Sequence, residues 1–92
     1  MIGSFKDKDA ADIFDGVPCR RYSGLVSVID RKLRALEAAV ALQELNVPPG
    51  NRLEALKGNR AGQHSIRVNQ QFRICFRWEG QHAYEIEIVD YH

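Results

Sequence analysis

The sequence contains no apolar run long enough to cross a bilayer. Its first residues also lack the basic start and apolar stretch of a secretory signal. Two cysteines occur, Cys19 and Cys75, and they form no CxxC pair and match no metal-ligand spacing. These absences favour a cytoplasmic protein whose thiols stay free in a reducing compartment.

Motifs of several enzyme classes are missing as well. The serines show no nucleophile-elbow pattern. The segment from Gly58 to Gly62 lacks the GK[ST] ending of a phosphate-binding loop. The three histidines, His64, His82 and His92, lack the spacing of a metal site. We therefore expect no metal and no other cofactor.

Length and composition are those of an ordinary small domain. A chain of 92 residues has room for one hydrophobic core, which predicts a single domain over residues 1–92. The content of 45% hydrophobic and 27% charged residues is typical of globular proteins and unlike that of disordered chains.

Charge is unevenly distributed along the chain although its net charge is only +1. Residues 1–50 are balanced, residues 51–78 carry six basic residues against one glutamate, and residues 79–92 carry four acidic residues. A basic block of this kind is expected of a surface that binds phosphates. The alternative is that the acidic last segment lies beside the block and neutralises it.

The N-terminal half predicts a short strand and two helices. Residues 2–5 fit the strand, and residues 9–14 fit a short helix that stops at Gly16. Ser23 is a plausible N-cap for a longer helix, which should end by about Leu45. Apolar residues recur along this helix at spacings of three and four, at Leu25, Ile29, Leu33, Leu36 and Val40.

The C-terminal half predicts three antiparallel strands joined by tight turns. Residues 63–68 alternate in polarity, and Asn69-Gln70 is a candidate turn. The clearest alternation runs through residues 72–78, and residues 84–88 alternate again after a second turn. One face is apolar, with Phe72, Ile74, Phe76, Trp78, Tyr84, Ile86 and Ile88. These patterns predict an α+β fold in which the long helix covers this face of an antiparallel meander.

The other face of the predicted sheet is polar and carries Arg67, Arg73, Arg77, Glu85 and Glu87. Arg77 lies close to the turn at Glu79, so we expect it to pair with a carboxylate. The partner of Arg73 depends on a strand register that the sequence does not fix.

Side chains that can cleave RNA without a metal are also present. Such a reaction needs a base for the ribose 2′-hydroxyl, cationic groups for the charge on phosphorus and an acid for the 5′-oxygen. His92 and Asp90 can transfer protons, Lys57 and Arg73 can bind phosphate, and Tyr91 can donate a hydrogen bond or stack. Each of these residues also has an ordinary structural interpretation, as a tail, a packed strand end, a surface turn or a paired arginine.

Three motifs taken together resemble a known family. They are L-x-x-L-K-G at residues 53–58, within the run from Pro49 to Asn69, then Phe72-Arg73-Ile74-Cys75-Phe76, and the closing Val89-Asp90-Tyr91-His92. They resemble HigB-type toxins of the RelE/ParE superfamily of toxin–antitoxin modules. The long helix and the first residues fit as well, so the resemblance extends over essentially the whole chain.

The resemblance implies a RelE-like fold and a ribosome-dependent endoribonuclease that cuts mRNA in the ribosomal A-site and inhibits translation. It also implies a HigA-like antitoxin with a helix-turn-helix, through which alone the toxin reaches operator DNA. Matching positions for the catalytic residues are Lys57, Arg73, Asp90, Tyr91 and His92. Candidates for RNA or ribosome contact are Arg52, Arg60, His64, Arg67, Asn69, Gln71 and Arg77.

Glu54 departs from the pattern of these toxins, which often have a histidine shortly before the lysine. An ionised carboxylate cannot donate a proton and repels phosphate, so the division of acid and base roles stays open. Two other functions remain alternatives. One is a ParE-like toxin that inhibits DNA gyrase, and the other is a weakened toxin that acts as a binding or regulatory partner of the antitoxin.

Overall fold

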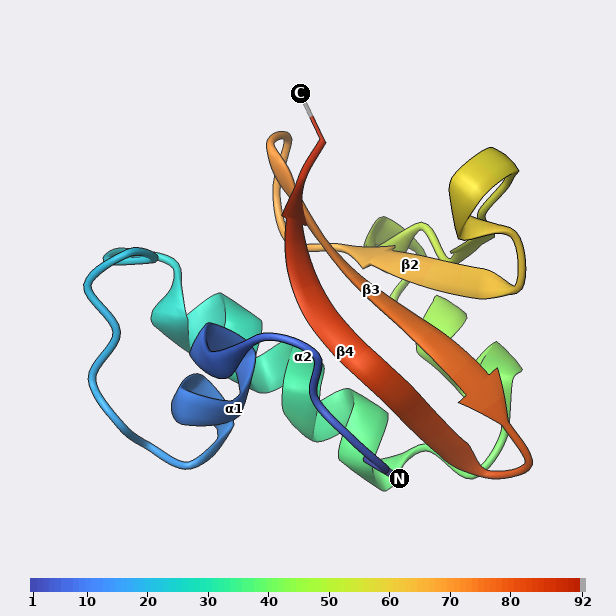
Figure 1. The fold of residues 1–92 in the computed structure, drawn as a ribbon, viewed down its shortest axis with the longest axis horizontal. Coiled ribbons are helices and arrows are strands. Elements are labelled where there is room, and N and C mark those ends of the chain that lie inside the picture. Colours follow the sequence, from blue (N-terminus) through green and yellow to red (C-terminus); the bar gives the residue numbers. More distant parts are fainter. Residues whose placement is uncertain (92) are drawn as a thin grey trace.

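The computed structural model, which describes residues 1–91, has two α-helices and a four-stranded antiparallel sheet in the order β1-β2-β3-β4. The helices, α1 and α2, lie together on one side of β4, and β2 lies across the sheet from them (Figure 1). None of the helices in residues 1–91 is long and apolar enough to cross a membrane. The elements are α1 (Lys8–Phe14), α2 (Val26–Ala38), η1 (Leu42–Asn46), η2 (Pro49–Asn51), β1 (Glu54–Ala55), η3 (Gly58–Arg60), β2 (Gln63–Arg67), β3 (Phe72–Glu79) and β4 (His82–Asp90).

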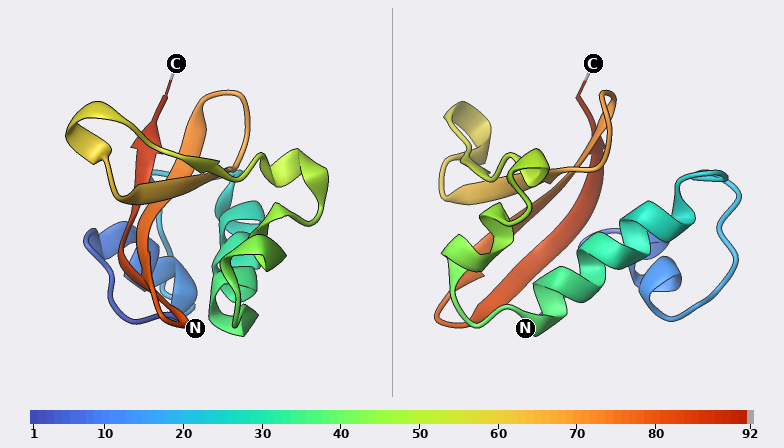
Figure 2. Two further views of the ribbon diagram at one scale, coloured as in Figure 1. Left: turned by 90° about the vertical axis from the view of Figure 1, so that its right-hand side faces the viewer. Right: turned by 180° about the vertical axis from the view of Figure 1, so that it is seen from behind.

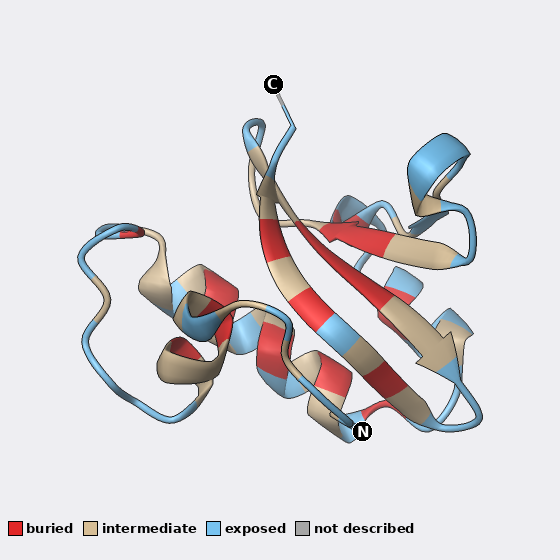
Figure 3. Ribbon diagram, in the orientation of Figure 1, coloured by how far each residue is buried: buried red, intermediate tan, exposed pale blue. Residues whose placement is uncertain are grey.

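The predicted α+β arrangement is confirmed, with one additional short strand, β1, at the edge of the meander. The two longest strands, β3 and β4, run side by side, and α2 crosses beneath them (Figure 2). Residues on one face of the sheet and one stripe of α2 are buried together (Figure 3). Removal of these apolar side chains from water is the main contribution to stability. The core includes Ile29, Leu33, Leu36, Ile66, Ile74, Phe76 and Ile86.

Helix α2 is shorter at both ends than its apolar stripe predicts. It begins at Val26, and Ser23 is not its cap, because Gly24 separates the two with a φ of +86°. Such a φ takes the chain out of the helical path and is tolerated by glycine. The residue at the cap position is Leu25, whose side chain makes no capping hydrogen bond.

The end of α2 at Ala38, before the predicted Leu45, also has a local explanation. After the helix the chain turns into η1, where the Glu44 carboxylate accepts hydrogen bonds from Val40 N at 3.1 Å and Ala41 N at 2.7 Å. These bonds satisfy backbone donors that a continuing helix would have paired itself. Leu45 still reaches the core, so the apolar pattern persists although the helix does not.

The N-terminal segment runs along β4 and is not a continuous strand. It makes two isolated parallel bridges, Ile2 with Ala83 and Phe5 with Ile86. Asp7 then caps α1, with its Oδ1 accepting from Ala10 N at 2.6 Å. The other oxygen of Asp7 accepts from Ile88 N in β4 at 2.7 Å, so one carboxylate both begins the helix and fixes it to the sheet.

Tyr84 lies on the opposite face of the sheet from the one its sequence pattern predicts. The register between β3 and β4 shifts between Cys75 and Arg77, and Glu85 has a φ of +56°. A bulge of this kind changes which residues point inward. Ala83 therefore enters the core, and the Tyr84 ring lies on the polar face with Arg77 5.2 Å from its centroid.

Candidate active site

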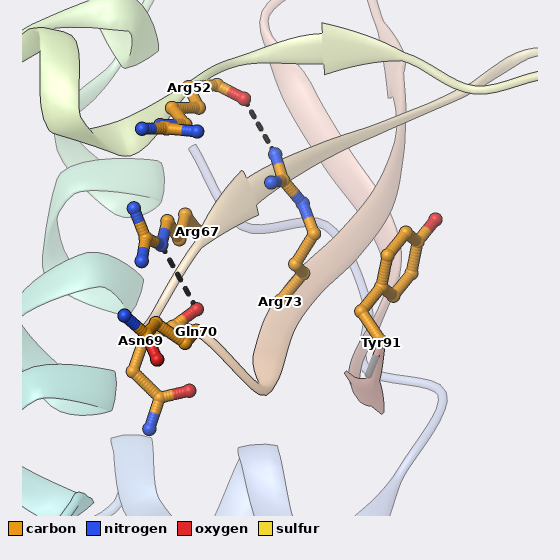
Figure 4. A pocket seen from close by; sticks show the side chains of 6 residues that line it. All are labelled: Arg52, Arg67, Asn69, Gln70, Arg73 and Tyr91. Carbon is orange, nitrogen blue, oxygen red and sulfur yellow. Dashed lines mark hydrogen bonds between the residues drawn. The ribbon is translucent and has the colours of Figure 1, made fainter.

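A pocket of about 270 Å³ lies at the end of the sheet where the β2–β3 turn meets the end of β4. Figure 4 shows three guanidinium groups around it, and Tyr91 beside Arg73. The lining residues are Arg52, Arg67, Asn69, Gln70, Arg73 and Tyr91. Three of these six residues are cationic, so the pocket is built to attract anions.

Arg73 is the most firmly held of the three arginines, and only 12% of its side chain is exposed. Its Nε donates to Ser65 Oγ at 2.7 Å. Its Nη2 donates to the backbone carbonyl of Arg52 at 2.6 Å and to that of Ser65 at 3.4 Å. The guanidinium is therefore fixed by groups from β2 and from the segment before β1, and it needs little further ordering to bind a ligand.

Tyr91 follows β4 and covers the polar face of the sheet next to this arginine. Its backbone N–H donates to Gln71 O at 2.6 Å, and its ring centroid lies 5.8 Å from the Arg73 guanidinium carbon. Partial burial raises the pKa of the Tyr91 phenol, so the hydroxyl stays protonated and can donate a hydrogen bond at neutral pH. Burial also raises the pKa of the neighbouring Cys75 thiol, which is therefore not a reactive thiolate.

One carboxylate stands at the edge of the pocket. Glu54 in β1 is paired in register with Ser65 and places its Oε1 3.9 Å from Arg73 Nη2. Its side chain is 54% exposed, so water weakens this ion pair. The sequence left the partner of Arg73 undecided, and the strand register shows that this partner is Glu54.

The acidic last strand neutralises part of the basic block, as one of the two sequence interpretations expected. Arg60 donates to Glu87 Oε2 at 3.0 Å, and this bond raises the pKa of Arg60. Arg77 lies 2.5 Å from Glu79 Oε1 and 3.7 Å from Glu85 Oε2, which confirms the pairing expected for it. Of the arginines that line the pocket, Arg73 has Glu54 as an acidic partner.

The predicted catalytic residues are not all gathered at the pocket. Lys57 lies between β1 and η3, and its exposed side chain makes no recorded hydrogen bond or ion pair with residues 1–91. Asp90 pairs in register with Phe72, which places its side chain on the face opposite Arg73. There it accepts a hydrogen bond from Gln71 Nε2 at 3.1 Å. His92 lies outside the described residues.

Three of the predicted RNA contacts make contacts within the protein. Asn69 lines the pocket, but its Oδ1 accepts from the backbone N–H groups of Gln71 and Phe72 and so closes the β2–β3 turn. The amide of Gln71 is bonded to Asp90. His64 stacks on Phe76 with ring centroids 6.2 Å apart, so it faces the core side of the sheet.

One residue at the site, Ser65, was not singled out from the sequence, and Gln70 was named only as part of the candidate turn. Gln70 lines the pocket from the turn, and Ser65 holds Arg73 from β2. Strand alternation puts Ser65 on the polar face with Arg67, which is the signal that could have identified it. Within residues 1–91, no group of three or more His, Cys, Asp or Glu side chains is placed to hold a metal ion.

A profile described as the RelE-like toxin HigB of type II toxin–antitoxin systems matches residues 4–92. The chain belongs to the HigB-like toxin family. It is 43% identical over 80 residues to Toxin HigB-1 of Vibrio cholerae, covering 85% of this chain and 84% of that protein. It is 36% identical over 97 residues to Endoribonuclease HigB of Proteus vulgaris, covering the whole of both.

Solved structures of related toxins share the fold of this HigB-like toxin. The YoeB–YefM toxin–antitoxin complex from Staphylococcus aureus contains a chain with a TM-score of 0.57 at 18% identity, covering 100% of this chain and 98% of that one. A YoeB/ParE toxin from Agrobacterium tumefaciens gives 0.56 at 18% identity, covering all of both chains. At this identity the likeness shows the fold alone. Membership of a type II toxin family means that this chain has an antitoxin partner.

Proposed function

We propose that this HigB-like toxin is an endoribonuclease that cuts mRNA bound to the ribosome and so stops translation. The observation that carries the proposal is Arg73, fixed at the wall of an arginine-lined pocket and next to Tyr91. Such a site has the donors and positive charge that RNA phosphates require. The 36% identity to Endoribonuclease HigB of Proteus vulgaris, over the full length of both chains, supports the same activity.

The proposed reaction uses the RNA's own ribose as the nucleophile. The 2′-oxygen attacks the adjacent phosphorus as a base removes its proton, and the 5′-oxygen leaves as an acid protonates it. The products are a 2′,3′-cyclic phosphate and a free 5′-hydroxyl, and no water or metal is consumed. The negative charge that accumulates on the phosphoryl oxygens must be stabilised by fixed donors.

In this scheme Arg73 stabilises the charge on phosphorus, because it is the guanidinium that the fold holds most rigidly. Tyr91 donates a hydrogen bond or stacks on a base, since its phenol stays neutral. Lys57 is proposed as a second phosphate ligand and His92 as a proton-transfer group. Glu54 can accept a proton when ionised but cannot donate one, and Asp90 contributes by holding the β2–β3 turn through Gln71.

RNA beyond the cleaved bond is proposed to contact Arg52 and Arg67. Both line the pocket, and within residues 1–91 the hydrogen bond that Arg67 donates comes from its Nε, to Asn69 O at 3.1 Å. Its terminal nitrogens therefore remain for phosphates or base edges. The proposed partners are the ribosome with mRNA, and a HigA-like helix-turn-helix antitoxin in the cytoplasm that would connect the toxin to operator DNA.

The test is cleavage of ribosome-bound mRNA by the purified toxin, with primer extension to locate the cut and analysis of the ends for a cyclic phosphate. Arg73→Ala should lower the rate about 100-fold or more, the usual cost of removing one donor that stabilises an oxyanion. Lys57→Ala should also lower it. Arg20→Ala is the matched control, because Arg20 is exposed in the α1–α2 connection and should leave the rate nearly unchanged.

Equal cleavage by the wild type and by Arg73→Ala would refute the assignment of the site. Inhibition of gyrase supercoiling without any RNA cleavage would replace the proposal with the ParE-like alternative. The family match and the name of the Proteus vulgaris relative both favour the nuclease.

A further inference from the structure

Ser65 is a buried polar residue on the otherwise mostly charged outer face of the sheet. In register it lies between Glu54 of β1 and Cys75 of β3. Its hydroxyl oxygen accepts the 2.7 Å hydrogen bond from Arg73 Nε, and it is the only side chain of residues 1–91 recorded to accept a bond from that nitrogen. A buried hydroxyl costs free energy unless it is paired, so this bond accounts for the presence of a serine here.

The second anchor of Arg73 is a backbone carbonyl in an unusual conformation. Arg52 adopts a left-handed φ of 47° and ψ of 55° directly after η2, which points its carbonyl oxygen at Arg73 Nη2, 2.6 Å away. The turn is fixed by buried Asn51, whose Nδ2 donates to Leu45 O at 3.0 Å. Lys32 of α2 donates to the Oδ1 of Asn51, so the anchor is connected to the long helix.

The anchors within residues 1–91 leave one nitrogen of the Arg73 guanidinium, Nη1, available to a ligand. A guanidinium has five N–H bonds, on Nε, Nη1 and Nη2. Nε and Nη2 are directed at the acceptors described above, whereas Nη1 makes no recorded hydrogen bond with residues 1–91. Figure 4 shows this remaining nitrogen on the side of the guanidinium that faces Arg67. The anchors therefore select the edge of Arg73 that meets a ligand in the pocket.

We propose that Ser65 is a positioning residue of the active site: it fixes the Arg73 guanidinium so that its Nη1 edge, and not another, meets the phosphate. The inference rests on the proposed function for its effect on catalysis, but the anchoring itself does not. Without the hydroxyl, Nε loses its acceptor, and within residues 1–91 the guanidinium is held through Nη2 alone and can pivot about that nitrogen. Loss of alignment at a reacting centre lowers the rate even when the charge is still present.

A double-mutant cycle tests this in the ribosome-bound mRNA assay. Ser65→Ala should lower kcat about tenfold or more and change KM by less than about threefold, because the positive charge that aids binding remains. Ser65→Thr, which restores a hydroxyl and suits a strand, should recover most of the rate. In the Arg73→Ala background, Ser65→Ala should have no further effect beyond about twofold, since residues that act through one another are not additive.

Ser27→Ala is the matched control, because Ser27 is exposed on α2 and should keep the wild-type rate. Thermal unfolding of every variant separates a loss of fold from a loss of alignment. The proposal is overturned if Ser65→Ala lowers kcat by the same factor in the wild-type and in the Arg73→Ala background. It is also overturned if a folded Ser65→Thr is as slow as Ser65→Ala.

A second measurement separates failure of this inference from failure of the proposed function. In 15N-labelled protein, the Nε–H resonance of Arg73 should exchange slowly with water in the wild type and in Ser65→Thr, and rapidly in Ser65→Ala. The exposed Arg34 Nε, bonded to Asp30 Oδ1 at 3.2 Å, serves as an internal reference that should not change. Slow exchange that persists in Ser65→Ala refutes the anchoring, whether or not the wild-type protein cuts RNA.

Discussion

Glu54 is a carboxylate that pairs with an arginine of the pocket, Arg73, and we expect it to weaken RNA binding. Its Oε1 lies 3.9 Å from Arg73 Nη2, and Nη1, the nitrogen proposed to meet the phosphate, belongs to the same guanidinium. Glu54→Gln keeps the size and polarity of the side chain and removes its charge. The prediction is that RNA binds more tightly to Glu54→Gln than to the wild type.

The size of the effect follows from the geometry. A phosphate oxygen bonded to Nη1 at about 2.8 Å lies no more than roughly 9 Å from the Glu54 carboxylate, since Nη1 and Nη2 are about 2.3 Å apart in the planar guanidinium. Two unit charges at that distance repel by about 0.5 kcal/mol in water and about 1.8 kcal/mol at an effective dielectric constant near 20. Because the Glu54 side chain is 54% exposed, the value should lie towards the lower figure. We expect about 0.6–1.3 kcal/mol, or roughly a three- to tenfold gain in affinity.

The assay is fluorescence anisotropy with an RNA oligonucleotide that carries 2′-O-methyl groups and so cannot be cleaved. Glu79→Gln is the matched control: it makes the same change of charge on an exposed glutamate paired with Arg77, towards the other end of β3 from the pocket. The gain for Glu54→Gln should exceed that for Glu79→Gln and should shrink at high salt. Equal affinities for the two variants, or weaker binding by Glu54→Gln, would refute the electrostatic argument.

Cleavage by the same variant then assigns a role to Glu54. Tighter binding with an unchanged or higher rate would make Glu54 an attenuating charge, as in the weakened-toxin alternative. Tighter binding with a large fall in kcat would make it a proton acceptor in the reaction.

Three further predictions concern stability. Leu33→Ala should lower the free energy of unfolding, measured by urea denaturation, by about 2–5 kcal/mol, because Leu33 is buried in the core. Val47→Ala is the control: Val47 is 72% exposed, so the change should be less than about 0.5 kcal/mol. Gly3→Ala should lower the free energy of unfolding by about 1–3 kcal/mol, since the added Cβ would lie 2.5 Å from the Tyr84 ring. Adding Tyr84→Ala should remove this destabilisation, and Gly50→Ala should be near neutral because the added Cβ would meet open space. Burial raises the pKa of the Cys75 thiol above its ordinary 9.0, so as pH rises this thiol ionises in the unfolded chain before it does in the folded protein. The stability that Cys75 contributes is therefore complete below about pH 9 and is lost as pH rises through the pKa of Cys75 in the folded protein. Urea unfolding from pH 7 to 10.5 should therefore show a steeper loss for the wild type than for Cys75→Ala, and parallel curves would contradict this.

The sequence determined the features that depend on local periodicity. The alternation through residues 72–78 correctly placed Ile74 and Phe76 in the core and Arg73 on the opposite face, because side chains on a strand alternate whatever lies around them. The stripe of α2 likewise predicted Ile29, Leu33 and Leu36 as core residues. The combined motifs predicted the family and the RelE-like fold.

Tertiary structure decided the features that depend on contacts between distant segments. The bulge near Glu85 moved Tyr84 to the polar face, and no period-two pattern can reveal an added residue in one strand. The registers of β1 with β2 and of β2 with β3 brought Glu54 and Ser65 to Arg73, from 19 and eight residues away in the sequence. Which arginines are neutralised and which remain for a ligand was fixed in the same way, because a charge pair depends on a few ångströms of separation that sequence spacing does not encode.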